Sequence, residues 1–205
     1  MDKNIYSITG ESLAKRFKRQ RLFRDISLTL DTGRSLSLTG PNGSGKSTLM
    51  QILAGIQQPT KGRVKYRCGG MDIPAGEAYR YMGFTSPVLN PYDELTGYEN
   101  IRFASRGAAG KEGIASLLEK FQLYEHRDKS LRYYSSGMKQ RLKFILAVIN
   151  DPPILFLDEP GTNLDRKGKD SLYSFIDEIR DKKIIIIATN EKEEVSLCRE
   201  EQNLA

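Results

Sequence analysis

The sequence is poor in cysteine, with two in 205 residues, and Cys68 and Cys198 lie too far apart to form a metal-binding spacing. This scarcity argues against a disulfide-stapled scaffold and a cysteine-based metal site, and it favours two reduced thiols in a cytoplasmic protein. An internal repeat and a low-complexity linker are also missing from the sequence.

Long apolar runs are absent as well, since no segment approaches the roughly 18 to 20 apolar residues that span a bilayer. The first ten residues, MDKNIYSITG, lack the apolar core of a secretory signal. We therefore expect a chain without a membrane span. Its 205 residues suffice for one large domain, or for a domain with a subdomain.

The charge is unbalanced toward the basic side, with a formal net charge of +6 and a pI near 9.2. Such a balance suits anionic partners in general, including nucleotides, nucleic acid and the cytoplasmic leaflet of a membrane. The most basic segment is KRFKRQRLFR, residues 15–24. This segment could simply be a basic surface that faces water and not an anion-binding site, because runs of charge are usually solvated.

The apolar pattern predicts an α/β protein. Strand-like segments occupy residues 6–10, 26–33 and 35–40, and a helical period begins at Lys46. Residues 113–123 and 136–149 are amphipathic helices, and a strand, a helix and a strand follow at 153–160, 169–181 and 183–190. This order implies a mainly parallel sheet, preceded by an N-terminal β part and interrupted by a helical insertion.

The stretch GPNGSGKST has the spacing of a phosphate-binding loop and lies between a predicted strand and a predicted helix. Its glycines let backbone N–H groups surround phosphates at a helix N-terminus, Lys46 reaches the β and γ phosphates, and the Ser47 hydroxyl can coordinate Mg²⁺. A plain glycine-rich turn is the alternative. The candidate ATP-binding residues here are Gly40, Pro41, Asn42, Gly43, Ser44, Gly45, Lys46, Ser47 and Thr48.

The segment ILFLDEP places Asp158 and Glu159 at the end of a buried strand. There Asp158 can hold a magnesium ion and Glu159 can polarise an attacking water, which makes Glu159 and Lys46 candidate catalytic residues. An ordinary turn at the strand end is the other interpretation. Together with the phosphate loop, the two carboxylates indicate ATP hydrolysis.

The segment IIIIATNEKEEV raises the question of what Asn190 does after four isoleucines of a strand buried on both faces. Ligands collect at the carboxyl ends of such strands, so Asn190 is a third candidate catalytic residue. It could equally be only the N-cap of the helix that follows.

A small-residue turn at Ser135, Ser136 and Gly137 opens a long helix in YYSSGMKQRLKFILAVI. Free N–H groups at a helix N-terminus can bind phosphate, although a simple helix cap explains the same residues.

The order of the phosphate loop, YSSGMKQR, ILFLDEP and GTNLD resembles the nucleotide-binding subunits of ABC transporters over nearly the whole chain. The resemblance implies one P-loop NTPase domain over residues 1–205, with a core at about 1–89 and 149–205 and a helical subdomain at about 90–148. It also implies ATP and Mg²⁺ as cofactors.

The same resemblance assigns further site residues. Ser135 and Gly137 match the family's signature loop, which contacts the nucleotide of the opposite subunit, whereas Ser136 and Met138 replace the usual Gly and Gln. Asp165 in GTNLD matches the family's D-loop aspartate, and Phe17 matches an aromatic residue that stacks on adenine. For Phe17 a core position is the alternative.

Two positions depart from the family pattern. Pro87 stands where the family usually has a glutamine that reaches the magnesium, and Asn190 stands where it usually has a histidine that touches the γ-phosphate. The single histidine, His126, lies in the predicted helical subdomain.

We expect the ATP-binding motor subunit of a bacterial-type ABC transporter. It would act as a homodimer, or with a paired nucleotide-binding subunit, around two ATP molecules. A separate integral-membrane permease would hold it at the inner face of the cell membrane. The short chain is similar to haem or cytochrome c biogenesis exporter subunits. A non-transport ABC ATPase acting on nucleic acid or ribosomes and a regulatory subunit with low turnover stay open, although no nucleic acid is expected.

Overall fold

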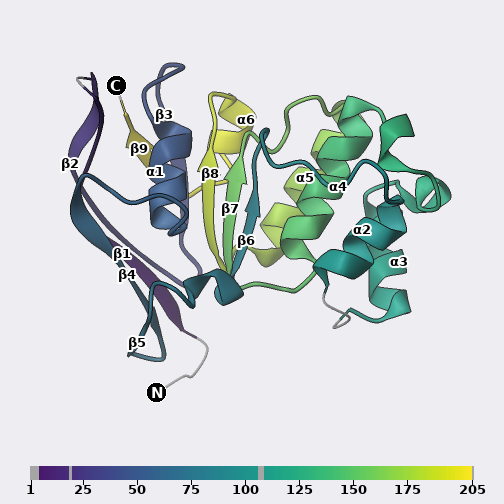
Figure 1. Ribbon diagram of the computed structural model, residues 1–205, viewed down its shortest axis with the longest axis horizontal. Helices are drawn as coiled ribbons and strands as arrows, with labels where there is room; N and C mark the ends of the chain where they lie inside the picture. The colour runs from purple at the N-terminus through teal and green to yellow at the C-terminus, as the bar shows by residue number, and fades with distance from the viewer. Residues whose placement is uncertain (1–4, 19, 106–108, 205) are drawn as a thin grey trace.

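The computed structural model describes residues 5–18, 20–105 and 109–204, and these form successive layers (Figure 1). The strands are β1 (Tyr6–Phe17), β2 (Gln20–Asp31), β3 (Ser35–Thr39), β4 (Lys61–Cys68), β5 (Met71–Ile73), β6 (Met82–Thr85), β7 (Ile154–Asp158), β8 (Ile184–Ala188) and β9 (Glu200–Asn203). The α-helices are α1 (Lys46–Leu53), α2 (Gly97–Ala104), α3 (Lys111–Lys120), α4 (Ser136–Val148), α5 (Arg166–Ile179) and α6 (Lys192–Val195). Three 3-10 turns are η1 (Ala78–Tyr81), η2 (Tyr124–His126) and η3 (Leu131–Tyr133).

The first layer is an antiparallel sheet in the order β2-β1-β4-β5. Its two long strands contain residues 15–17 and 20–24 of the basic segment, where Arg16 pairs with Arg21 and Phe17 pairs with Gln20. The apolar pattern of the sequence predicts a first strand that ends at residue 10, because basic side chains interrupt that pattern farther along. One face of an antiparallel sheet tolerates charge when it faces water, so the strands continue through that segment.

The second layer is a parallel sheet in the order β6-β7-β8-β3-β9. All five residues of β7 and all five of β8 are buried. Ile184 and Ile186 pack into the cluster on the α1 side, and Ile185 and Ile187 pack into the cluster on the opposite side. The prediction of a parallel-sheet strand buried on both faces is therefore confirmed for the isoleucine run.

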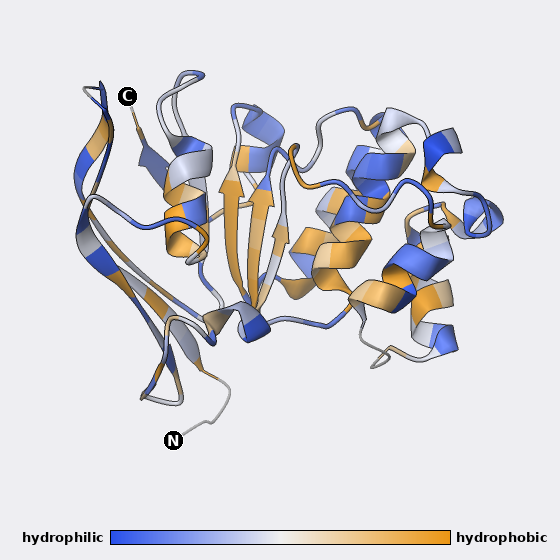
Figure 2. Ribbon diagram, viewed as in Figure 1, coloured by the Kyte–Doolittle hydropathy of each residue, from blue (hydrophilic) through white to orange (hydrophobic). Residues whose placement is uncertain are grey.

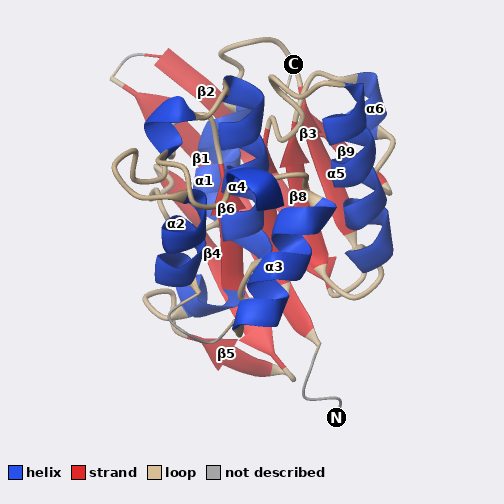
Figure 3. Cartoon of the chain, turned by 90° about the vertical axis from the view of Figure 1, so that its right-hand side faces the viewer, coloured by secondary structure: helices blue, strands red, loops and turns tan. Residues whose placement is uncertain are grey.

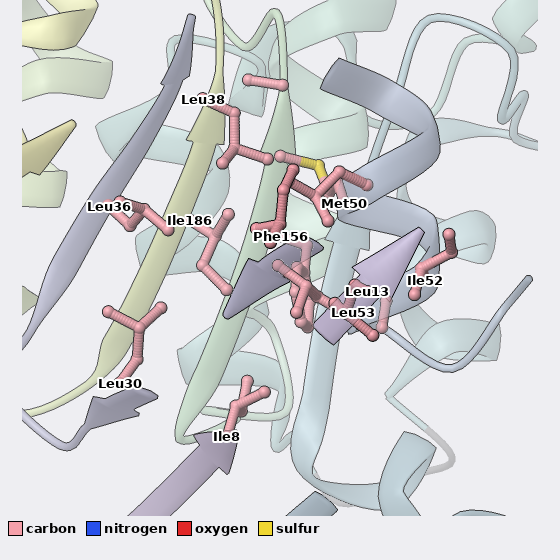
Figure 4. Packing of buried hydrophobic residues seen from close by; sticks show 14 of the residues in the cluster. Ile8, Leu13, Leu30, Leu36, Leu38, Met50, Ile52, Leu53, Phe156 and Ile186 are labelled. Atoms are coloured by element: carbon pink, nitrogen blue, oxygen red, sulfur yellow. The ribbon is translucent and has the colours of Figure 1, made fainter. Parts of the chain in front are cut away.

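Helix α1 lies between the two sheets (Figure 1). Met50 and Leu53 are fully buried there, in the same cluster as Ile8 of the antiparallel sheet and Phe156 of the parallel sheet (Figure 4). Because α1 begins directly after the phosphate loop, this packing fixes that loop above the carboxyl ends of β3, β7 and β8.

Helices α4 and α5 cover the other face of the parallel sheet, and α2 and α3 lie farther out (Figures 1 and 3). These helices carry both apolar and polar stretches (Figure 2), and buried residues such as Leu142 of α4 and Leu172 of α5 share one cluster with Ile185 of β8. The rings of Phe121, Phe144 and Phe175 lie within 5.2 to 5.6 Å of one another, centroid to centroid. None of the helices within residues 5–18, 20–105 and 109–204 has the length and apolar character needed to cross a membrane.

Candidate functional site

The phosphate loop joins β3 to α1, and several of its residues have backbone conformations that favour glycine. Gly40, Gly43 and Gly45 have φ values of 134, 83 and 105°, in the region that other residues adopt only with strain. Gly45 is also the N-cap of α1, and a Cβ there would come within 3.3 Å of the Leu22 side chain. The glycines therefore allow the loop to curve, and Gly45 allows it to approach β2 closely.

Lys46 is 7% exposed and folds back over its own loop. Its Nζ donates to the backbone oxygens of Gly40 at 2.7 Å and Pro41 at 3.2 Å. The amide N–H of Ser44 also donates to the Pro41 oxygen, at 3.1 Å. The lysine charge is thus held at the centre of the loop, where an incoming phosphate would compete with the two carbonyl groups.

Ser47 and Asp158 meet across the gap between α1 and β7. The Ser47 hydroxyl donates to Asp158 Oδ1 at 3.0 Å. Burial raises the pKa of the Asp158 carboxyl above its ordinary value, while the hydrogen bond from Ser47 opposes that shift. A hydroxyl and a carboxylate are both oxygen ligands of the kind that magnesium prefers.

Glu159 follows directly and lies in a tight backbone turn, with a φ of 49°. Its amide N–H donates to the Ala188 oxygen at 2.9 Å, which ties it to the end of β8. The side-chain amide of Gln140 in α4 donates to the backbone oxygens of Glu159 at 3.2 Å and Pro160 at 3.0 Å. Two independent elements therefore fix the position from which the carboxylate extends.

A cavity of about 330 Å³ lies in front of the loop and Glu159. It is lined by Leu22, Asn42, Gly43, Gly45, Lys46, Ser47, Thr48 and Glu159. The structure thus brings Glu159 to the phosphate loop although the two are more than a hundred positions apart. Leu22 was missed by the sequence analysis, since only the pairing of β1 with β2 places it there.

Asn190 contacts the same loop. Its Nδ2 donates to Oδ1 of Asn42 at 3.0 Å. The alternative that Asn190 only caps the next helix is wrong, because the N-cap of α6 is Glu191, whose N–H is accepted by the Thr189 hydroxyl at 2.9 Å. The amide of Asn190 is directed instead toward the phosphate-binding region.

Ser135, Gly137 and Asp165 do not line the cavity of the phosphate loop. Ser135 is the N-cap of α4 and accepts from the Met138 N–H at 3.2 Å. Asp165 caps α5 in the same manner and accepts from the Gly168 N–H at 3.0 Å. A Cβ on Gly137 would come within 2.8 Å of the Asn163 oxygen, so the first turn of α4 packs closely on the loop before α5.

Phe17 lies at the end of β1 and is 45% exposed, so the alternative of a core position is wrong. The Lys15 ammonium group lies 4.9 Å from the centre of its ring. Phe17 does not line the cavity either.

Two buried polar side chains near the site were not predicted from the sequence. Gln140 holds the Glu159 turn, as described above, and Glu194 of α6 accepts from the Gly161 N–H at 2.7 Å. Burial raises the pKa of the Glu194 carboxyl above its ordinary value. No local pattern distinguishes either residue from the other polar side chains of its helix; a buried position facing the Glu159 loop is visible only in three dimensions.

A family model and similar curated proteins agree on the family of this chain. The family model described as ABC transporter matches residues 23–162. The chain is 32% identical over 176 residues to the bacitracin transport ATP-binding protein BcrA of Enterococcus faecalis, covering 85% of this chain and 57% of that protein. It is 35% identical over 185 residues to the spermidine/putrescine import ATP-binding protein PotA of Protochlamydia amoebophila, covering 86% and 48%.

A third relative, the sulfate/thiosulfate import ATP-binding protein CysA of Escherichia coli, is 31% identical over 202 residues, covering 93% of this chain and 55% of that protein. The chain thus spans about half the length of the curated relatives it matches.

Solved structures agree with the fold. The ATP-binding cassette MJ0796 in a dimeric post-hydrolysis state with ADP and phosphate has a TM-score of 0.83 at 21% identity, covering 96% of this chain and 93% of that one. A bacterial Atm1-family ABC exporter with ATP bound has a TM-score of 0.85 at 20% identity, covering 100% and 38%. The predicted α/β fold of a P-loop NTPase, with its antiparallel β part, is confirmed.

Proposed function

The chain belongs to the ABC transporter family, and from that membership we propose that it binds and hydrolyses ATP as the motor cassette of a transporter. The observation that carries the proposal is the meeting of the phosphate loop with the end of β7, where Ser47 contacts Asp158 at 3.0 Å and Glu159 faces the same cavity as Lys46. Phosphate binding and a candidate general base thereby share one site.

Lys46 and the glycine-rich backbone bind the phosphates in this proposal. The lysine charge already lies inside the loop, and charge-assisted hydrogen bonds to phosphate are stronger than those to the carbonyl groups of Gly40 and Pro41. Phe17 stacks on the adenine through its exposed face, and Asn42 and Thr48 line the phosphate side.

Magnesium fits the residues that are present. Ser47 and Asp158 would hold it, since Mg²⁺ is commonly bound by one or two protein oxygens together with phosphates and water. When bound, the ion neutralises charge that develops on the phosphate oxygens. Glu159 orients and deprotonates the attacking water, and its fixed backbone keeps that carboxylate in place during the reaction.

The cassette works as a dimer, either with a second copy or with a paired nucleotide-binding subunit. The positions of Ser135, Gly137 and Asp165 support this, because they lie outside the cavity of their own phosphate loop. We propose that the α4 N-terminus, with Ser135 as its cap, faces the nucleotide held by the opposite subunit. Each ATP is then enclosed by two chains.

We propose that a membrane permease docks beside residues 84–104, in the helical subdomain of about residues 90–148 and at its border with the core. An apolar cavity of about 250 Å³ there includes Leu89, Tyr92 and Phe103, which are 48%, 56% and 66% exposed. The rings of Tyr92 and Phe103 meet edge to face at 5.5 Å. Docking would hold the chain at the inner face of the cell membrane.

The transported substrate stays outside the proposal. The three relatives reported above are named for bacitracin, spermidine/putrescine and sulfate/thiosulfate, and they give no support to the haem or cytochrome c exporter subtype.

The test combines phosphate release with co-purification from detergent-solubilised cells. The proposal expects Mg²⁺-dependent phosphate release from ATP and recovery of a polytopic membrane protein with the tagged chain. Recovery of RNA in place of a membrane protein would favour a non-transport ATPase. ATP binding without phosphate release would favour a regulatory subunit, which is the alternative that the replacements at Pro87 and Asn190 leave open.

A further inference from the structure

A buried hydroxyl group at the end of β6 has no hydrogen-bond partner among the described residues. Ser86 is 1% exposed, and its Oγ is one of few buried side-chain polar atoms in the described chain without a partner. Buried hydroxyl groups are nearly always paired, because leaving one unpaired is unfavourable. Such a hydroxyl can take up a ligand when it also faces a binding site, so the direction in which Ser86 points decides its role.

The strand register, continued by one residue past the end of β6, sets Ser86 beside Asp158. Phe84 pairs with Phe156 on neighbouring parallel strands, and their rings lie 6.1 Å apart on the α1 side of the sheet. Side chains alternate between the two faces with a period of two. Asp158 is the last residue of β7, and Ser86 directly follows β6, whose last register pair is Thr85 with Leu157. The same alternation, continued by one residue, sets Ser86 on the α1 face with Asp158, which accepts there from Ser47.

The residues between them face the other way. Thr85 pairs with Leu157, and Leu157 belongs to the cluster on the helical side. A Cβ on Gly83 would come within 2.0 Å of the Ala147 oxygen in α4, so Gly83 also faces the helices. The alternation of β6 is thus regular up to its last residue, which supports the direction assigned to Ser86.

The backbone at this point is held in place. The Lys143 ammonium group donates to the Pro87 oxygen at 2.9 Å and reaches the Ser86 oxygen at 3.5 Å. Pro87 has a restricted φ and no N–H to offer a ligand. The backbone of Ser86 and Pro87 therefore cannot easily rotate to give the Ser86 hydroxyl another partner. The polar group that these two residues can offer to the site is the Ser86 hydroxyl.

We propose that the Ser86 hydroxyl forms a hydrogen bond with a water molecule bound to the magnesium ion at Ser47 and Asp158. The inference rests on the proposed function, since it requires the metal and nucleotide to bind there. Ser86 would then position the metal-bound water from the β6 side of the site. Partners of metal-bound groups of this kind commonly change metal affinity by about 10-fold or more.

The test compares Ser86→Ala with Thr85→Val. Both substitutions remove a buried hydroxyl that lacks a partner in the described chain, but Thr85 faces the helical side. Mn²⁺ serves as a paramagnetic probe in place of Mg²⁺, titrated by electron paramagnetic resonance in the presence of a non-hydrolysable ATP analogue. Binding of the analogue alone is measured in EDTA, and melting temperatures are recorded with and without the metal–nucleotide complex.

We expect Ser86→Ala to weaken Mn²⁺ binding on the order of tenfold and to leave analogue binding in EDTA unchanged. Its ligand-free melting temperature should equal or exceed the parent's, because an unpaired buried hydroxyl is removed, while its stabilisation by Mn²⁺ and analogue should shrink. Thr85→Val should keep the parent's Mn²⁺ affinity. Unchanged Mn²⁺ affinity in Ser86→Ala, or an equal loss in Thr85→Val, would overturn the inference. A parent that binds no nucleotide would instead refute the proposed function.

Discussion

The side-chain amide of Asn190 donates to the side-chain oxygen of Asn42 at 3.0 Å, which joins the end of β8 to the phosphate loop. The two residues are 148 positions apart, and both are exposed. An amide at this place offers a donor and an acceptor that do not titrate. The contact therefore holds a neutral polar group ready beside the phosphate site at any physiological pH.

The first prediction concerns this amide. In Asn190→Ala we expect turnover to fall at least about tenfold while ATP still binds, since removing a donor aimed at transition-state charge costs roughly 2.7 to 4 kcal/mol in well-studied enzymes. Asn190→His should equal or exceed the parent, and the parent's pH profile should lack a histidine limb. Steady-state phosphate release from about pH 6 to 9 measures all three proteins.

The control for that experiment is Asn42→Ala, which removes the contact but keeps the Asn190 amide. If turnover falls by the same factor in both alanine variants, the loss comes from a displaced phosphate loop and not from a missing contact between Asn190 and the phosphate. A parent-like rate in Asn190→Ala would rule out the γ-phosphate role.

The second prediction concerns Lys46. Lys46→Ala should bind ATP at least tenfold more weakly, because a charge-assisted hydrogen bond to phosphate is worth about 1.5 to 3 kcal/mol. Titration with a fluorescent ATP analogue measures the affinity. Lys61→Ala is the matched control, since Lys61 is an exposed lysine at the start of β4. Equal affinities for parent and Lys46→Ala would contradict the phosphate-loop assignment.

The third prediction concerns Glu159. Glu159→Gln should keep ATP bound but lose the group that deprotonates water, so the nucleotide-enclosed dimer should accumulate. Light scattering in the presence of Mg-ATP should then report dimers, whereas Glu119→Gln, at an exposed position of α3, should behave as the parent. Hydrolysis by Glu159→Gln at the parent rate would show that another group acts as the base.

The fourth prediction concerns the buried carboxyl of Glu194. Its pKa is raised by burial, so the stability it contributes is fully present below the ordinary glutamate pKa and is lost as the pH rises through the raised value. Glu194→Gln keeps an acceptor for the Gly161 N–H and removes the buried charge. Its melting temperature should therefore exceed the parent's by a margin that grows from about pH 4 to 8.

Glu194→Ala separates charge from hydrogen bonding. It leaves the Gly161 N–H buried without an acceptor, which costs about 1 to 3 kcal/mol of unfolding free energy. Thermal melts across the pH range test both variants, with Glu119→Gln as the exposed control. A Glu194→Gln variant less stable than the parent at about pH 8 would show that the ionised carboxylate is stabilising after all.

Much of the fold was predictable because its signals are local. The isoleucine run of β8 and the apolar run of β7 are too evenly apolar for a half-exposed strand, and both are buried on both faces. The long hairpin of β1 and β2 was predicted too short, because Phe17 and its basic neighbours look like a loop until a partner strand is present. The edge strand β9 is polar in sequence, so only its pairing with β3 defines it.

The sequence by itself determined the phosphate loop, the carboxylates Asp158 and Glu159, and the class of the fold. These rest on spacings within one segment, where glycine conformation and strand or helix periodicity act over a few residues.

Only the tertiary structure decided which of these groups meet. The contact of Ser47 with Asp158 spans 111 positions, and the inferred placement of Ser86 beside Asp158 depends on the register of β6 against β7. Register and helix packing are set by how side chains fill the space between layers, and a change of one residue in register would turn Ser86 to the opposite face. That choice depends on both strands and on the helices that cover them, so no single stretch of the chain contains it.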